Sequence, residues 1–230
     1  MSLPYFVSPD PRAGVLEGAE AQHAHVKRIE VGERIVLTDG HGLTTTVTVT
    51  HTTKSQLRGD VIAEEVVPAP TPRVTVVQAI PKSERAELAV DLAVQAGADE
   101  ILPWISHRTI ARWPENKQAK LVEKWRNQAV ASAKQSRRAW IPEVGMPVGS
   151  GWLGGVDKQK LVLHEDATVS LKDVDLADEL FLVVGPEGGI GADELELIGG
   201  TPVKLGPEVL RTASAAFAGL CAIGVRTARW

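Results

Sequence analysis

The hydrophobic and polar positions near the C-terminus form the same pattern twice. The apolar run 181–184 is followed by a glycine-bearing turn and by the mixed apolar and acidic stretch 191–198. The short run 203–205 is followed by a second such turn and by the alanine-rich stretch 213–220. Each pattern predicts a buried strand, a turn and a helix. Two such units in succession would place two turns at one edge of a sheet, where open α/β proteins bind ligands.

The preceding part of the chain alternates in the same way. Apolar runs predict strands at 74–80, 100–105 and 161–163, and helices lie between the first and second and after the second. Strands that alternate with helices indicate a mainly parallel sheet. The glycine-rich stretch 146–160 predicts an irregular or edge connection.

Two helices are expected between these strands. The first ends at Gly97, and Leu88, Leu92 and Ala96 are predicted to form its buried face. The second is basic and runs from about residue 116 to residue 137. The chain therefore predicts an α/β domain.

Residues before about position 70 have a mostly β pattern. The segments 33–38 and 44–50 flank the turn Asp39–Gly42, which predicts a β-hairpin, and 57–67 supplies another strand. Alternating threonine and valine suits a half-buried antiparallel sheet. About seventy residues of short strands predict a small barrel.

The segment Pro68–Arg73 is the clearest boundary in the chain. Its three prolines at alternate positions predict a stiff, extended connector. We therefore expect two domains, at residues 1–70 and 74–230.

Composition limits the classes of protein. The chain has 230 residues, of which 43% are hydrophobic and 23% charged, as in soluble globular proteins. It has no run long enough to span a bilayer, and its first residues lack the pattern of a signal peptide. One cysteine, Cys221, excludes an internal disulfide and a cysteine-cluster zinc site. We expect a cytoplasmic protein. His164 has no second histidine or cysteine at ligand spacing, so no metal site is expected.

Positive charge is concentrated in one region although the net charge is −4. The basic residues there are Arg108, Arg112, Lys117, Lys120, Lys124, Arg126, Lys134, Arg137 and Arg138. Such a cluster can bind nucleic-acid phosphates, or it can be the solvated face of an amphipathic helix. Trp125 follows Leu121 at helical spacing, which indicates core packing. Trp113 and Trp140 lie outside the helix and fit either packing or base stacking.

The first glycine-bearing turn, Gly185–Gly189, has the chemistry of a ligand-binding loop. Glycine allows positive φ and close approach of a ligand to the backbone, and Pro186 stiffens the turn. The turn matches neither the dinucleotide fingerprint nor the phosphate-binding loop. A tight strand-to-helix connection without a ligand is the alternative.

Five ordered stretches resemble the RsmE family of the SPOUT methyltransferases, the 16S ribosomal RNA (uracil-N3)-methyltransferases. They are Gln78–Leu88, Ala133–Arg138, Leu161–Glu165, Gly185–Gly189 and Leu205–Thr212. The resemblance extends over essentially the whole chain. It implies a C-terminal trefoil knot, an N-terminal PUA-like β-barrel that binds RNA, and a homodimer.

The resemblance also implies the reaction, which is methyl transfer from S-adenosylmethionine to N3 of a uridine in the 16S RNA of the small ribosomal subunit. The implied cofactor contacts are Leu163, His164, Gly185, Pro186, Glu187, Gly188, Gly189, Leu205, Gly206, Leu210 and Thr212. Gly188 is expected to permit close approach of the cofactor. Arg211 is the leading catalytic candidate, because a guanidinium can hold the uracil oxygen that gains charge as N3 loses its proton. The alternative is a structural role in which Arg211 pairs with a helix end or a carboxylate. Glu187 is either a general base or a hydrogen-bond acceptor for the cofactor.

A second group of residues is expected to bind RNA. Its members are Arg28, Lys82, Arg85, Lys134, Gln135, Ser136, Arg137 and Arg138. The chain departs from many relatives at Lys134, where an acidic residue is usual, and at one of the two arginines Arg137 and Arg138, where glycine is usual. It also departs at Glu208, where arginine is usual, and at Ala213, where glutamate is usual. A mechanism that needs that glutamate is therefore in question.

The last helix, rich in alanine and glycine, suits internal packing or a dimer interface. Two other functions remain open. One is a SPOUT methyltransferase that acts on another RNA position, and the other is an RNA-binding relative without activity.

Overall fold

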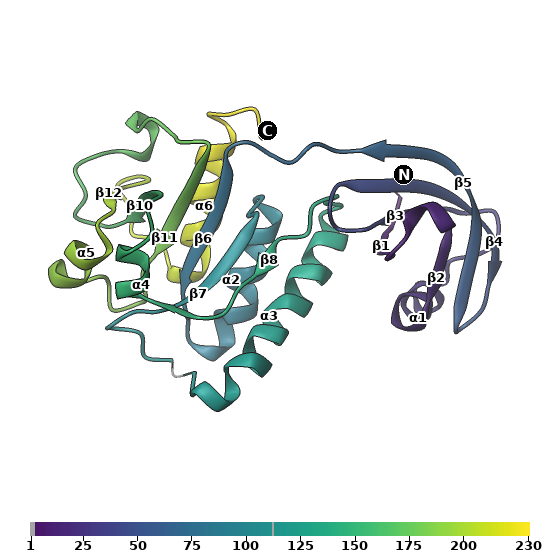
Figure 1. Cartoon of the computed structure of the whole chain (residues 1–230), viewed down its shortest axis with the longest axis horizontal. Helices are drawn as coiled ribbons and strands as arrows, with labels where there is room; N and C mark the ends of the chain where they lie inside the picture. The colour runs from purple at the N-terminus through teal and green to yellow at the C-terminus, as the bar shows by residue number, and fades with distance from the viewer. Residues whose placement is uncertain (1–2, 112) are drawn as a thin grey trace. The chain divides into compact units, whose positions relative to one another are not determined.

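In a computed structural model, the chain folds into two compact units (Figure 1). The structure describes residues 3–111 and 113–230, with only the backbone of residues 83 and 84. The first unit comprises residues up to Ala69 together with Ala133–Ile141. The second comprises Pro70–Ser132 and Pro142–Trp230.

The first unit is a curled sheet with the strand order β1-β3-β4-β5-β2. Its strands are β1 (Tyr5–Val7), β2 (Val15–Glu17), β3 (Arg34–Thr38), β4 (Leu43–Thr52) and β5 (Gln56–Val66). The predicted hairpin is confirmed, because β3 and β4 pair antiparallel with Thr38 opposite Thr44. Its turn is closed by the Asp39 carboxylate, which accepts hydrogen bonds from the amides of His41 at 2.7 Å and Leu43 at 3.1 Å.

Two features of this unit are absent from the sequence prediction. The helix α1 (Gly18–Val26) lies in a part of the chain described only as mostly β, and β1 pairs parallel with β3. The hydrophobic cluster of this unit explains both, because Phe6 on β1 and Ala21 and Ala24 on α1 are buried against the strands. The unit also includes the short 3-10 helix η1 (Pro11–Ala13).

The segment Ala133–Ile141 completes the first unit. The Ala139 carbonyl accepts hydrogen bonds from Thr38 Oγ1 at 3.2 Å and from the Gly42 amide at 3.0 Å. Trp140 donates its indole N–H to the Val67 carbonyl at 2.9 Å. A side chain on Gly42 would lie 2.8 Å from the Trp140 ring, so this tryptophan has a packing role.

The second unit contains the parallel sheet that the sequence predicts. Its main path is β12-β10-β11-β6-β7-β8, with β9 beside β7. Every adjacent pair is parallel. The strands are β6 (Arg73–Ala79), β7 (Glu100–Ile105), β8 (Glu143–Val144), β9 (Val148–Gly149), β10 (Gln159–Leu163), β11 (Glu179–Val184) and β12 (Thr201–Val203). Such strands read as continuous apolar runs because both faces of the sheet are covered.

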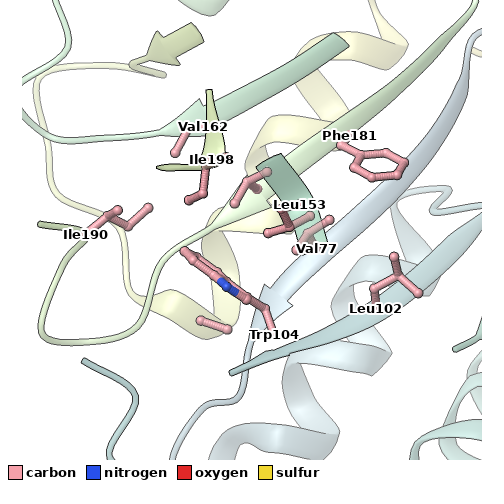
Figure 2. Packing of buried hydrophobic residues seen from close by; sticks show 10 residues of the cluster. Val77, Leu102, Trp104, Leu153, Val162, Phe181, Ile190 and Ile198 are labelled. Carbon is pink, nitrogen blue, oxygen red and sulfur yellow. The ribbon is translucent and has the colours of Figure 1, made fainter. Parts of the chain in front are cut away.

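Helices cover the two faces of this sheet. The hydrophobic cluster of Figure 2 joins Val77 and Trp104 of the sheet to Leu153 and Ile198. These two residues belong to α4 (Ser150–Gly154) and α5 (Ala192–Ile198).

The opposite face packs against α6 (Thr212–Gly224), which in turn packs on α2 (Ser83–Gln95). The Cβ position at Gly219 lies 2.8 Å from Leu182, so the lack of a side chain allows α6 to approach β11. The last two elements are α3 (Glu115–Gln135) and the 3-10 helix η2 (Leu171–Asp173). The predicted fold class is confirmed as far as the sheets show it: a parallel α/β domain is preceded by a small β unit.

The buried face predicted for α2 is partly wrong. Leu88 is 47% exposed and Leu92 is half-buried, whereas Ala96 is buried as expected. The stripe that faces inward consists of Ala89, Val90, Ala93 and Val94. The sheet and α6 accept these smaller side chains at close range, and the larger leucine faces outward.

Trp113 and Trp125 pack against each other in the second unit. Trp125 is 2% exposed, which confirms its core position on α3. Trp113 packs edge-to-face on it, with ring centroids 5.2 Å apart.

In the predicted irregular stretch 146–160, the structure has β9, α4 and the start of β10. Within the described ranges, no helix has the length and apolar character needed to cross a membrane.

Candidate active site

A pocket of about 610 Å³ lies where three parallel strands end. The segments Leu163–Asp166, Val184–Ile190 and Val203–Thr212 line it, and they follow β10, β11 and β12. Because the carboxyl ends of parallel strands meet at one edge of the sheet, the two glycine-bearing turns face the same space. Arg85, Arg108 and Ala215 complete the lining. The volume suits a small-molecule ligand.

The predicted cofactor contacts all lie on this pocket. They are Leu163, His164, Gly185, Pro186, Glu187, Gly188, Gly189, Leu205, Gly206, Leu210 and Thr212. The folding of the chain therefore brings together residues that the sequence separates by almost fifty positions. Their individual roles remain predictions.

The first turn has a specific need for glycine at three positions. Gly189 has a φ of +69°, and its amide donates to the Pro186 carbonyl at 3.0 Å. A side chain at Gly185 would lie 2.8 Å from Ile190. A side chain at Gly188 would lie 3.3 Å from the Cβ of Arg108. Arg108 therefore leaves little room for a side chain at Gly188.

Arg108 is a pocket residue that the sequence prediction did not place there. Its Nη1 donates to the Gly188 carbonyl at 3.2 Å, which links the loop after β7 to the glycine turn. In the sequence, Arg108 was noted only as the first member of the basic region. Its position shortly after the strand 100–105 could have indicated that it lies at the same edge of the sheet as the glycine turns. Arg112, a later member of that region, lies outside the described residues.

A buried carboxyl group supports the loop that carries Arg108. Glu194 on α5 is 0% exposed, and its Oε1 accepts hydrogen bonds from the His107 amide at 2.8 Å and from Ser150 Oγ at 2.6 Å. Ser150 Oγ in turn accepts the indole N–H of Trp104 at 3.1 Å. The core of the unit therefore fixes the backbone position next to Arg108.

His164 is oriented by its two neighbours. The Asp166 amide donates to its Nδ1 at 3.2 Å, which assigns the ring proton to Nε2. Nε2 lies 3.3 Å from the Ile190 carbonyl, so it is placed to donate there. Across the described residues, no group of three histidine, cysteine, aspartate or glutamate side chains is placed to hold a metal ion.

The two catalytic candidates are exposed at the pocket. Arg211 precedes α6, and no described residue forms a hydrogen bond or an ion pair with its guanidinium. Glu187 Oε1 lies 3.4 Å from the Lys82 amide, a long hydrogen bond. Thr212, at the start of α6, is buried.

The departures from the family pattern can also be placed. Glu208 lies on the pocket lining, and Ala213 is buried in α6.

The acidic and basic residues of the pocket lining are equal in number. They are the acidic Glu165, Asp166, Glu187 and Glu208 and the basic Arg85, Arg108, Lys204 and Arg211.

The predicted RNA-binding residues are divided between the two units. Arg85 lines the pocket, and the Lys82 backbone contacts Glu187. The others are in the first unit and are Arg28, Lys134, Gln135, Ser136, Arg137 and Arg138.

Lys134 is already engaged within the first unit. Its Nζ lies 2.6 Å from Glu20 Oε1 and 3.3 Å from His23 Nδ1, with only 14% of the side chain exposed. Burial and the charge of Lys134 lower the pKa of His23. The charge of Lys134 is thus compensated internally.

Comparison with known proteins identifies the family. Residues 68–224 match the RNA methyltransferase domain, and residues 16–62 match the RNA methyltransferase PUA domain. The chain is 42% identical, over its whole length and 94% of the relative, to ribosomal RNA small subunit methyltransferase E of Mycobacterium tuberculosis.

Solved structures agree with the sequence comparison. Ribosomal RNA small subunit methyltransferase E from Neisseria gonorrhoeae, bound to S-adenosyl methionine, has a TM-score of 0.88 and 26% identity over 98% of both chains. A putative methyltransferase from Legionella pneumophila, in complex with the same cofactor, has a TM-score of 0.87 and 28% identity over 98% of both chains.

The domain match and the shared fold therefore place the chain in the RNA methyltransferase class. Within that class, the chain belongs to the ribosomal RNA small subunit methyltransferase E family, and the resemblance seen in the sequence is confirmed.

Proposed function

We propose that this protein transfers a methyl group from S-adenosylmethionine to N3 of a uridine in the 16S RNA of the small ribosomal subunit. Membership of the methyltransferase E family supports rRNA methylation with this cofactor. The observation that carries the proposal is the pocket between two glycine-bearing loops in the methyltransferase domain. The choice of uridine N3 rests on the five ordered sequence stretches.

The chemistry of the lining fits this cofactor. Leu163, Ile190 and Leu205 supply apolar surface for a flat purine ring, and the two loops supply backbone amides and carbonyls for polar groups. S-adenosylmethionine supplies an activated methyl group on a sulfonium cation, so the protein needs no metal or covalent nucleophile. The protein must position the uracil and assist the loss of its N3 proton.

Arg211 is the residue we assign to charge stabilisation. Its exposed guanidinium at the pocket is suited to hold O2 or O4 of the uracil as N3 deprotonates. Glu187 is either the general base or an acceptor for the cofactor, and its exposure at the same pocket suits both.

The remaining predictions belong to the same proposal. The PUA-like domain would comprise residues 1–70 and the methyltransferase domain residues 74–230. The PUA-like domain and the segment Gln135–Arg138 would contact the RNA. The protein would act as a homodimer in the cytoplasm. The C-terminal chain would form a trefoil knot. Two features support this part of the proposal: β12 lies at the edge of the sheet next to β10, and α6 packs against β11.

The test is a mass-spectrometric nucleoside map of small-subunit RNA from a strain that lacks this protein. The expected result is loss of 3-methyluridine, restored by incubation with the protein and S-adenosylmethionine but not with the Arg211→Ala variant. A different missing modification would refute the N3 assignment and keep the methyltransferase activity. No missing modification would indicate an RNA-binding protein without activity.

A further inference from the structure

Gln78 is a polar residue in the core of the second unit. It lies near the end of β6, a central strand of the sheet, and is only 1% exposed. The register places it beside Val184 of β11 and Pro103 of β7. An apolar side chain at this position would avoid the unfavourable burial of an amide. The presence of glutamine therefore needs an explanation.

Two hydrogen bonds fix the orientation of the Gln78 amide. Its Nε2 donates to the Ala79 carbonyl at 3.0 Å and to the Thr212 carbonyl at 3.4 Å, which is a long hydrogen bond. Because both partners are acceptors, the nitrogen and not the oxygen of the amide must face them. Oε1 is buried, and no described residue donates to it. The side chain therefore serves as a donor.

The bond to Ala79 replaces one that the sheet cannot form. The Arg73 amide donates to the Asp178 carbonyl, so alternate residues of β6 from Arg73 onward direct their backbone groups toward β11. In this ladder the donor to the Ala79 carbonyl would be the amide of residue 186. Residue 186 is Pro186, which has no N–H, and Gln78 supplies the missing donor.

The bond to Thr212 connects the same point to α6. Thr212 is the first residue of α6 and lies on the pocket lining. Arg211, directly before it, has an extended backbone and forms no side-chain hydrogen bond to the helix end. The position of Arg211 therefore depends on the backbone of Thr212. One buried amide joins the end of β6 to the helix that follows the second glycine-bearing loop.

We propose that Gln78 is a positioning residue for methyl transfer, which holds the start of α6 so that the Arg211 guanidinium keeps its place at the pocket. Gln78 is not among the residues that line the pocket, so it acts through Thr212. A displacement of about 1 Å in a group that assists the reaction can lower the rate by about 10²-fold. The role of Arg211 rests on the proposed function, whereas the placement of α6 by Gln78 does not.

The test uses Gln78→Met in the full-length protein, because methionine has a similar volume and no donor. The substrate is small ribosomal subunits from the strain that lacks this protein, with labelled S-adenosylmethionine. The value of kcat should fall by about tenfold or more. The KM for subunits and the dissociation constant of the cofactor, measured by calorimetry, should change by less than about twofold. A purely structural role would not separate kcat from the two affinities.

Thr75→Val is the matched control, because it removes a buried polar group from the other end of β6. Thr75 is 3% exposed, and its Oγ1 donates to Glu100 Oε2 at 3.0 Å. Loss of this bond should lower the melting temperature by about 2–4 °C, as should Gln78→Met. The control should leave kcat unchanged, since Thr75 has no contact with α6 or with the pocket lining among the described residues.

A double variant separates the two hydrogen bonds of the Gln78 amide. Pro186→Ala provides an N–H at the ladder position that faces Ala79. Combined with Gln78→Met, it should recover melting temperature, but kcat should stay below that of Pro186→Ala alone because no donor holds Thr212. Hydrogen exchange of the backbone amides of residues 212–216, measured by mass spectrometry, should be faster in both proteins that carry Gln78→Met.

An unchanged kcat in Gln78→Met would overturn the inference, and so would a loss of cofactor affinity as large as the loss in kcat. Recovery of kcat in the double variant would overturn it equally, because the bond to Ala79 would then be the whole role of Gln78. Unchanged hydrogen exchange would show that Gln78 does not hold α6. Label incorporation does not depend on which atom is methylated. Absence of 3-methyluridine from the labelled RNA would therefore refute the N3 assignment and leave this test valid.

Discussion

The guanidinium of Arg229 lies against the carboxylate of Asp99, with Nη1 and Oδ2 2.8 Å apart and side chains only 4% and 7% exposed. Arg229 also donates to the carbonyls of Pro72 and Gly97. Asp99 accepts the Val74 amide at 2.7 Å. The end of the chain is thereby fixed to the beginning of β6 and to the turn before β7.

Removal of one partner of this pair should destabilise the protein strongly. Arg229→Ala removes the cation that pairs with the buried Asp99 carboxylate, and breaking such a pair costs about 3 kcal/mol. Urea unfolding measures the loss. The matched control is Arg12→Ala, which breaks the exposed pair with Glu64 and should have a much smaller effect. Equal losses in the two variants would show that burial of the pair is unimportant.

Glu194 should stabilise both the second unit and the loop that carries Arg108. Glu194→Ala removes the acceptor for two buried hydrogen bonds and should lower the free energy of unfolding by about 2–3 kcal/mol. It should also weaken S-adenosylmethionine binding, measured by calorimetry, because Arg108 contacts the glycine turn. Glu196→Ala, on the exposed side of the same helix, should leave both quantities nearly unchanged.

Gly219 should not tolerate a side chain. A Cβ there would lie 2.8 Å from Leu182 and 3.6 Å from Leu163, so Gly219→Ala should destabilise the protein by about 1–3 kcal/mol through overpacking. Gly151 on α4 has no neighbour within 4 Å of its Cβ position. Gly151→Ala should therefore stabilise the protein by about 0.5–1 kcal/mol. A gain in stability from the first substitution, measured by urea unfolding, would contradict the packing described.

The cluster around His23 should make stability depend on pH. Because burial and Lys134 lower the pKa of His23 in the folded protein, the unfolded chain binds this proton more readily. The contribution to stability is present above the unfolded pKa of about 6.5 and is lost as the pH falls through the lower folded pKa. His23→Gln should reduce the loss of stability between about pH 7 and pH 5.

NMR titration can identify the cause of the His23 shift. Lys134→Met should raise the pKa of His23, because the charge of Lys134 lowers this pKa more than the charge of Lys27 does. Lys27→Met should raise it less, since Lys27 is the smallest contributor. The reverse order would mean that the contact at 3.3 Å does not govern the titration.

Arg211 should affect turnover more than cofactor binding. Arg211→Ala removes the cation proposed to stabilise the uracil anion, and the loss of one such donor lowers kcat by about 10²–10³. The dissociation constant of S-adenosylmethionine, measured by calorimetry, should change little. A large loss of cofactor affinity with kcat preserved would reassign Arg211 to the cofactor.

The sequence by itself determined the parallel sheet, the hairpin and the two glycine turns. These features depend on local pattern: apolar runs require covered sheet faces, and glycine is needed where φ is positive or the backbone is closely approached. The pattern predicted two turns at one edge of the sheet, and the structure places both on one pocket. The individual cofactor candidates came from the family resemblance.

Only the tertiary structure decided the features that depend on residues far apart in sequence. Gly188 lies against Arg108, eighty positions away, and Lys134 is neutralised by Glu20 rather than exposed. Leu88 fits the helical period of a buried face, but close packing admits only the smaller stripe beside it. Local pattern records which side chains are apolar or charged. It does not show which residue from a distant part of the chain packs against a given side chain or compensates its charge. Tertiary packing determines those partners.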